Sequence, residues 1–152
     1  MAESLQKVTK IVTALETLSK KISDEVTKVY DHEICVNHPW FTLIADGRKK
    51  FDGRAYWKKI LTMKTGDILK LTLNLDEKKG AKKDTENKPP IYKRIGRILR
   101  YRNFEEALQT LGLEDTLPTV TTLQEGIEIY NKYVSPKTQL ENGVCMIELL
   151  NI

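Results

Sequence analysis

Three charged side chains stand close together in the first half of this sequence: Lys49, Asp52 and Arg54. Lysine and arginine are the usual phosphate-binding side chains, and a carboxylate accepts hydrogen bonds from amino groups such as those of nucleobases. Because Asp52 lies two residues before Arg54, an extended chain puts both side chains on one face, where they can pair. These residue types predict a small basic site for an anionic ligand.

The pattern leaves two other roles open for the same residues. Asp52 and Arg54 can form an ion pair that is only structural. Lys49 and Asp52 are the candidate catalytic residues if the protein is an enzyme. A lysine acts as a base or nucleophile only after burial has lowered its pKa, whereas a nearby carboxylate favours the charged form. The charged form suits phosphate binding, so binding is the leading interpretation and catalysis the alternative.

An aromatic and basic segment follows directly, from Tyr56 to Lys59. Aromatic rings among basic side chains are typical of surfaces on which nucleobases stack. We therefore extend the predicted site over this segment and over the basic residues of 91–101. The predicted nucleic-acid contacts are Arg48, Lys49, Lys50, Asp52, Arg54, Tyr56, Trp57, Lys58, Lys59, Arg94, Arg97 and Arg100.

Charge is segregated along the chain, although the formal net charge is only +4. Residues 47–102 hold 18 basic and 6 acidic side chains, whereas residues 103–152 hold 2 basic and 8 acidic ones. Such a distribution favours a polyanion as partner, and RNA is the expected one. The alternative is that many of these lysines only solvate faces and loops.

Length and composition bound the remaining possibilities. With 152 residues, of which 40% are hydrophobic, the chain fits one domain plus an appendage. No apolar run approaches the roughly 20 residues that cross a bilayer, so we expect an intracellular protein, cytoplasmic or nuclear, without membrane contact. Cys35 and Cys145 are expected to be buried free thiols, and we expect neither a metal nor a cofactor.

Residues 4–30 carry apolar side chains at three- and four-residue steps without an intervening glycine or proline, which predicts one long amphipathic helix. The spacing is close to a heptad. The helix can pack on its own domain, form a homodimer or bind another partner, or remain a mobile arm. Its apolar positions are Leu5, Val8, Ile11, Val12, Leu15, Leu18, Ile22, Val26 and Val29.

The rest of the chain alternates between strand-like and helix-like patterns. Strands are predicted at residues 32–37, 49–54, 69–75, 91–101 and 144–150. Short helices are predicted after Pro39, at 104–111 after an Asn103 cap, and after Thr122, while 76–90 reads as a mobile charged loop. This order predicts an α+β fold whose strands curl into a small mixed β-barrel with helices at one end.

Two predicted strands carry further expectations. In 49–54 the period of two puts Lys49 on the face opposite Asp52, unless a bulge intervenes. In 91–101 Gly96 marks a bulge. Four leucines define the buried face of the third strand, namely Leu69, Leu71, Leu73 and Leu75. The exposed basic side of the fourth strand is predicted to hold Lys93, Arg94, Arg97 and Arg100.

Six motifs in order resemble an ASCH domain, the activating-signal-cointegrator homology group of the PUA-like superfamily. The resemblance covers roughly residues 32–152. The matching residues are Pro39-Trp40 with Leu43-Ile44, Gly47-x-Lys49-x-x-Asp52-Gly53-Arg54, Gly66-Asp67, Tyr101-Arg102-Asn103-Phe104, Leu117-Pro118 with Glu125-Gly126 and Tyr130, and Gly143-Val144.

The resemblance implies a PUA-like barrel whose cleft is lined by a Gly-x-Lys-x-x-Glu-x-Arg segment, with a role in binding RNA or nucleotides. Lys49 and Arg54 match that segment, while Asp52 stands where the motif has glutamate. Some small members are amidohydrolases of acetylated cytidine with a threonine at this position, and ribonuclease activity is also attributed to the group. Residues 1–31 lie outside the resemblance as a separate helical segment.

Overall fold

The computed structural model describes residues 2–27, 29–75 and 88–152, so most of the predicted 76–90 loop lies outside the described residues. The chain divides into two compact units, Met1–Tyr30 and Asp31–Ile152. Among the described residues, no helix combines the length and apolar character needed to cross a bilayer.

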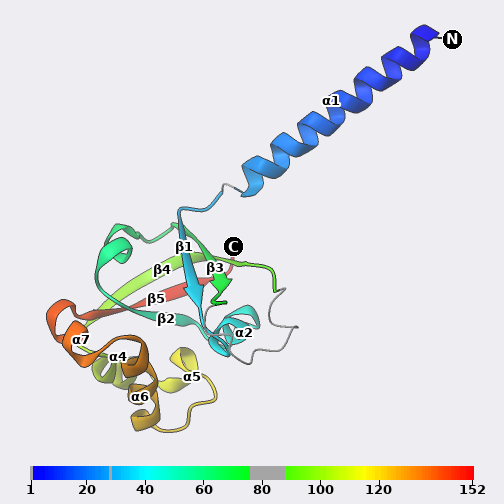
Figure 1. Ribbon diagram of the computed structural model, residues 1–152. Coiled ribbons are helices and arrows are strands. Elements are labelled where there is room, and N and C mark those ends of the chain that lie inside the picture. Colours follow the sequence, from blue (N-terminus) through cyan, green and yellow to red (C-terminus); the bar gives the residue numbers. More distant parts are fainter. Residues whose placement is uncertain (1, 28, 76–87) are drawn as a thin grey trace. The chain divides into compact units, whose positions relative to one another are not determined.

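The first unit is one helix, α1 (Ala2–Thr27), drawn in blue in Figure 1. The sequence pattern predicted this helix with an end three residues later, at Tyr30. The large apolar side chains between Leu5 and Ile22 are exposed, from 46% for Val12 to 70% for Leu5. In proteins most helix stability comes from packing of the apolar face against another element.

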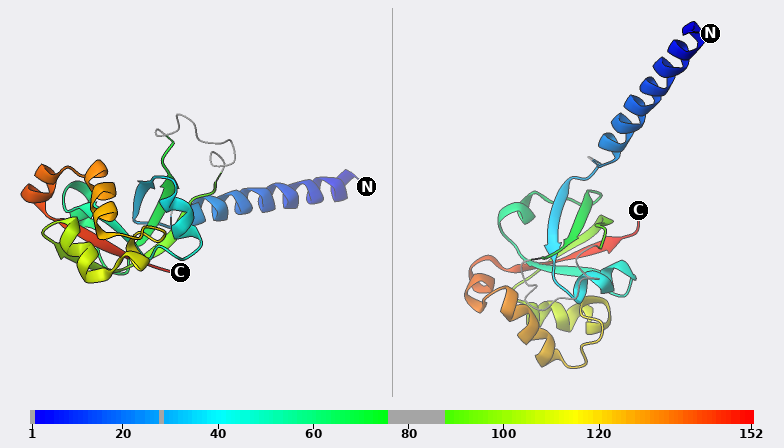
Figure 2. Two further views of the ribbon diagram at one scale, coloured as in Figure 1. Left: turned by 90° about the horizontal axis from the view of Figure 1, so that it is seen from below. Right: turned by 45° about the vertical axis from the view of Figure 1, so that its right-hand side comes forward.

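The second unit is built on one five-stranded mixed sheet that curls into a half-barrel (Figures 1 and 2). The strand order is β1-β3-β4-β5-β2, with β1 parallel to β3 and all other neighbours antiparallel. The edge strands are therefore β1 and β2. The strands are β1 (His32–Val36), β2 (Phe51–Ala55), β3 (Ile68–Leu73), β4 (Ile91–Tyr101) and β5 (Val144–Leu150).

Short helices complete this unit, and four of them, α4 to α7, gather at one end of the curled sheet (Figure 2). This arrangement confirms the predicted α+β barrel-like class with flanking helices. The bounds are α2 (Trp40–Ala45), the 3-10 helix η1 (Lys58–Thr62), α4 (Phe104–Leu111), α5 (Leu113–Thr116), α6 (Leu123–Tyr133) and α7 (Pro136–Asn142).

Local sequence explains most of these elements. Alternation in β3 buries Leu69, Leu71 and Leu73 in the core. Leu75, predicted on the same face, is 52% exposed because the strand ends at Leu73. The ladder between β4 and β5 shifts register between Ile95 and Ile98, which confirms the bulge at Gly96.

Side-chain caps fix where the helices begin. Asn103 Oδ1 accepts a hydrogen bond from the Glu106 amide at 2.9 Å, and Thr122 Oγ1 accepts one from the Glu125 amide at 3.2 Å, both as predicted. Ser135 caps α7 in the same way. Neither α5 nor α7 was predicted from the sequence.

Two further expectations were wrong. Lys93, predicted on the exposed side of β4, is 8% exposed and donates to Asn151 Oδ1 at 2.7 Å. Its neighbour Arg94 is exposed, because successive side chains on a strand point to opposite faces. Cys35, predicted to be buried, is exposed on an edge strand, whereas Cys145 is buried in β5 and both thiols are free.

Candidate functional site

A cavity of about 730 Å³ lies between the two edges of the half-barrel and the end of α6. We call it the Lys49 cavity. Residues from both edge strands, β1 and β2, contribute to its walls, together with α2, η1, α6 and α7. Its charged and aromatic lining residues are Trp40, Lys49, Asp52, Arg54, Trp57, Lys58, Lys59, Tyr130, Lys132 and Tyr133.

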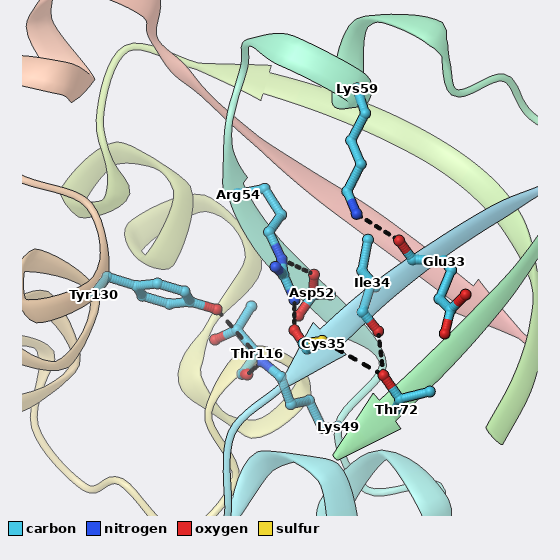
Figure 3. Close-up of polar contacts among 10 residues, drawn as sticks. All are labelled: Glu33, Ile34, Cys35, Lys49, Asp52, Arg54, Lys59, Thr72, Thr116 and Tyr130. Atoms are coloured by element: carbon cyan, nitrogen blue, oxygen red, sulfur yellow. Dashed lines mark hydrogen bonds and ion pairs between the residues drawn. The ribbon is translucent and has the colours of Figure 1, made fainter. Parts of the chain in front are cut away.

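Side chains, not ladder hydrogen bonds, join the two edge strands at this cavity (Figure 3). Arg54 of β2 donates from Nη2 to the main-chain carbonyl of Cys35 in β1 at 2.6 Å. Lys59 of η1 donates to the carbonyl of Glu33, two residues earlier in β1, at 2.5 Å. Alternate carbonyls of an edge strand point to the same side, so both cations bind the open edge of β1.

Arg54 is held on its other side by Asp52, whose Oδ2 accepts from Arg54 Nε at 2.6 Å. The Asp52 side chain is 6% exposed and that of Arg54 29% exposed. Burial by itself lowers the pKa of Arg54, but the charge of Asp52 and the hydrogen bond to it outweigh burial and leave the pKa above its ordinary value. The guanidinium is thus a permanent cation in a fixed orientation.

Lys49 lies just before β2 and is 4% exposed. A main-chain hydrogen bond of 2.9 Å from its amide to the Leu43 carbonyl ties it to α2. Because the strand begins only at Phe51, the period of two does not extend to Lys49. The predicted placement of Lys49 opposite Asp52 is therefore wrong, since both line the same cavity.

The Lys49 ammonium group contacts few polar atoms. It donates to the main-chain carbonyl of Thr116 and, at 3.4 Å, to the hydroxyl of Tyr130 (Figure 3). The Trp40 ring centroid lies 5.6 Å away. Burial lowers the pKa of Lys49 from 10.5 to about 8. Asp52 opposes this change and Arg54 reinforces it. The burial that catalysis by Lys49 would require is present.

Contacts with Phe104 and Gly53 position the Tyr130 ring. The ring stacks on Phe104 with centroids 4.1 Å apart and an interplanar angle of 7°. Gly53 lies against it so closely that a Cβ atom there would be 2.7 Å from Tyr130 Cε1. Burial also raises the pKa of Tyr130, so its hydroxyl keeps its proton. The glycine between Asp52 and Arg54 therefore admits the ring that contacts Lys49.

The segment after β2 forms the rim of the Lys49 cavity. Trp57 is 37% exposed, and Lys58 Nζ lies 4.1 Å from the centroid of its indole ring. Lys58 has a backbone φ of 52°, in the left-handed region that non-glycine residues rarely adopt. Such strain is concentrated at functional sites in proteins.

Six of the twelve predicted contact residues line the Lys49 cavity: Lys49, Asp52, Arg54, Trp57, Lys58 and Lys59. The other six lie elsewhere on the second unit. Their observed contacts are Arg48 to Asp46 at 2.7 Å, Lys50 to Asp115 at 3.6 Å, Arg97 to Glu148 at 2.8 Å, Arg94 to the Gly66 carbonyl at 3.2 Å, and Arg100 to the Tyr56 ring at 3.9 Å.

The wall formed by α6 and α7 was missed as part of the site. Tyr130 was not among the predicted site residues, although it belongs to the motifs that resemble the ASCH group. Trp40 is 9% exposed, belongs to the hydrophobic core and also lines the cavity. Ser135 and Thr138 belong to α7, a helix that was not predicted.

The described residues contain no group of three or more histidine, cysteine, aspartate or glutamate side chains able to hold a metal ion. The Lys49 cavity can bind a ligand through hydrogen bonds and charge. Lys49 and Arg54 provide donors, and Asp52 provides an acceptor whose Oδ2 is engaged by Arg54.

Two solved structures are similar to this chain. The crystal structure of hypothetical protein PH0355 superposes with a TM-score of 0.65 at 28% sequence identity, covering 80% of this chain and 98% of that one. The solution NMR structure of protein PF0455 from Pyrococcus furiosus superposes with a TM-score of 0.59 at 26% sequence identity, covering 79% of this chain and 96% of that one. No protein-family model and no curated protein matches the chain. Both similar structures match this fold over nearly their whole length.

Proposed function

We propose that this protein is a nucleic-acid-binding module of the ASCH group, with RNA as its ligand and the Lys49 cavity as its binding site. The observation that carries the proposal is that Lys49, Asp52 and Arg54 line one cavity between the edge strands β1 and β2 of the half-barrel. The motif that resembles the ASCH group thus coincides with a place where cations join the sheet edges.

The charge of the cavity supports an anionic ligand. Its described lining holds five cationic side chains against the single acidic side chain of Asp52. Cations clustered around a concave site attract and orient phosphates. The cationic lining residues are Lys49, Arg54, Lys58, Lys59 and Lys132.

Size and aromatic content support a nucleotide in particular. A volume of about 730 Å³ lies within the range of about 300–1,000 Å³ that is usual for small-molecule sites. Trp57 on the rim offers an indole face on which a base can stack, in place of the Lys58 ammonium that now covers it. Asp52 can accept hydrogen bonds from the amino group of a base.

A fluorescence anisotropy titration tests this proposal. Labelled single-stranded RNA, duplex RNA and duplex DNA are titrated with the wild type and with the double variant Lys49→Ala/Arg54→Ala, at about 50 mM and about 200 mM salt. We expect single-stranded RNA to bind most tightly, because its bases can enter the cavity. Binding should weaken steeply with salt and be lost in the double variant. Equal binding by the variant, or affinity independent of salt, contradicts the proposal.

The lowered pKa of Lys49 favours a second candidate function. With a pKa of about 8, this lysine is partly neutral near physiological pH and can act as a general base. Together with the resemblance, this supports a hydrolase acting on acylated cytidine-type nucleosides or on RNA. Its Lys49 would take a proton from the attacking water or hydroxyl group.

The two candidates differ in their dependence on pH. Hydrolysis of N-acetylcytidine by neutral Lys49 should accelerate as the pH rises toward about 8 and disappear in Lys49→Ala. Phosphate binding by charged Lys49 should instead weaken over the same range. Absence of turnover at every pH rules out the hydrolase for that substrate.

A further inference from the structure

A second cavity, of about 1,110 Å³, adjoins the Lys49 cavity. Asn131, at the end of α6, lines both cavities. Within α7 and its cap, Ser135 and Thr138 face the Lys49 cavity, whereas Pro136 and Gln139 line the second one. The start of α7 is therefore the ridge that separates the two cavities.

This ridge is fixed by a satisfied polar junction. The Gln139 side chain is 4% exposed and accepts from the Phe104 amide at 3.1 Å. Its amide group donates to Asn131 Oδ1 and to the Val134 carbonyl, both at 2.8 Å. A buried amide with all these partners holds α4, α6 and α7 in one arrangement. The two cavities therefore have a constant relation to each other.

A stacked pair of side chains borders the second cavity. Arg100 of β4 lines the second cavity, and its guanidinium carbon lies 3.9 Å from the ring centroid of Tyr56. Tyr56 directly precedes Trp57, which lines the Lys49 cavity. Stacking fixes the face of a guanidinium and leaves its N–H donors free to bind phosphate. Within the described part of the chain, Arg100 makes no ion pair and no side-chain hydrogen bond.

Two of the other charged residues of the second cavity, Glu106 and Arg102, pair with each other. Glu106 accepts from the main-chain amide of Arg102 at 3.0 Å and from Arg102 Nε at 3.3 Å. The Arg102 side chain is 89% exposed. Glu105 also lines this cavity. Arg100 is thus the cation best placed to receive an anion there.

We propose that single-stranded nucleic acid follows a path across this ridge from one cavity to the other, in which Arg100, stacked on Tyr56, binds the phosphate next to the nucleotide held in the Lys49 cavity. This inference rests on the proposed function. It adds a second subsite for the flanking nucleotides, bounded by Arg102 and the α7 ridge. A polynucleotide therefore binds more tightly than a mononucleotide does.

A length series tests this path on the full chain. The probes are a mixture of the four nucleoside 5′-monophosphates and a mixed-sequence RNA of about eight nucleotides, measured by calorimetry and anisotropy. The variant is Arg100→Ala, and its control is Lys64→Ala, which removes the same charge from an exposed position that lines neither cavity. Lys49→Met reports on the Lys49 cavity alone.

The path predicts a specific pattern. Arg100→Ala should lower affinity for the longer RNA about five- to tenfold more than affinity for the monophosphates, and should reduce the salt slope by about 0.7. Lys64→Ala should change both affinities less than about twofold. Lys49→Met should weaken every probe.

Failure of the path and failure of the proposed function give different results. If the longer RNA loses affinity in Lys49→Met but binds equally well to Arg100→Ala and Lys64→Ala, the second subsite is refuted and the Lys49 cavity stands. The same holds if the wild type binds the monophosphates and the longer RNA alike. If no probe binds, the proposed function falls and the path with it.

Discussion

The guanidinium of Arg54 and the main-chain carbonyl of Cys35, 2.6 Å apart, belong to opposite edges of the curled sheet. This hydrogen bond joins β2 to β1 where no ladder does. The same guanidinium is paired with the buried Asp52. One side chain therefore closes the half-barrel and forms part of the wall of the Lys49 cavity.

Replacing Arg54 by alanine should destabilise the second unit as well as weaken binding. The change leaves Asp52 buried without its partner and frees the Cys35 carbonyl, so we expect a loss of about 1–3 kcal/mol in the free energy of unfolding. Urea denaturation measures it. Arg48→Ala is the matched control, because the Arg48 pair with Asp46 is exposed and should matter little. Equal effects in the two variants contradict a bridging role for Arg54.

The lowered pKa of Lys49 predicts a dependence of stability on pH. Because the folded pKa of about 8 lies below the ordinary value of 10.5, the unfolded chain binds more protons between these two values. The free energy of unfolding should therefore rise with pH over this window. The contribution of Lys49 should be of order 3 kcal/mol when the window has been crossed.

The measurement compares urea unfolding of the wild type and Lys49→Met between about pH 7 and about pH 10. Subtracting the two curves removes the titration of every other group that the variants share. The difference should favour the wild type increasingly above about pH 8. A difference that stays constant with pH shows that Lys49 titrates normally.

Gly53→Ala tests how Tyr130 is positioned. The added Cβ atom would lie 2.7 Å from Tyr130 Cε1 and 2.9 Å from Phe104 Cε1, so the stacked rings must shift away from β2. Overpacking of this kind costs about 1–3 kcal/mol, and RNA affinity should fall because the shifted ring changes the cavity wall.

Tyr130→Phe separates the ring from its hydroxyl. The ring and its stack on Phe104 remain, while Lys49 loses a hydrogen-bond partner at 3.4 Å. We expect near-normal stability together with a change in the pH dependence of binding. The outcome against the preceding prediction is RNA binding by Gly53→Ala that equals binding by the wild type. The position of the Tyr130 ring would then be unimportant to the site.

Local sequence patterns predicted the parts of the fold that a few neighbouring residues determine. Alternation placed β3, and the caps at Asn103 and Thr122 placed the starts of α4 and α6. The bulge in β4 lies at Gly96, where a Cβ atom would clash with Glu148 Oε1. Each of these features depends on a few neighbouring residues or on one repeating step.

The burial of the site depends on contacts between residues far apart in the sequence, so local patterns could not predict it. Burial of Lys49 is produced by Thr116 and Tyr130, more than 60 residues later in the chain. The number of cations in a segment does not show which acidic side chains they pair with. Arg97, a predicted contact residue, pairs with Glu148 of β5 and lies outside the cavity. The short helix α7 has too few residues to show an amphipathic period.

The apolar stripe of α1 predicts self-association. Leu15→Glu places a charge in the middle of this stripe, where Leu15 is 59% exposed. If a second copy covers the stripe, Leu15→Glu should convert a dimer into a monomer in analytical ultracentrifugation. Thr17→Glu, which adds the same charge beside the stripe, is the control. A wild type that is monomeric at all concentrations contradicts the dimer.

Intrinsic tryptophan fluorescence tests whether RNA enters the Lys49 cavity, because the chain has two tryptophans, Trp40 and Trp57, and both line this cavity. Unlabelled single-stranded RNA is titrated into the wild type and into Trp57→Phe, with anisotropy of a labelled RNA recorded in parallel. We predict saturable quenching at the same RNA concentrations that raise the anisotropy, with most of the quenching lost in Trp57→Phe. RNA binding that leaves tryptophan fluorescence unchanged would place the ligand outside the cavity and refute the Lys49 cavity as the binding site.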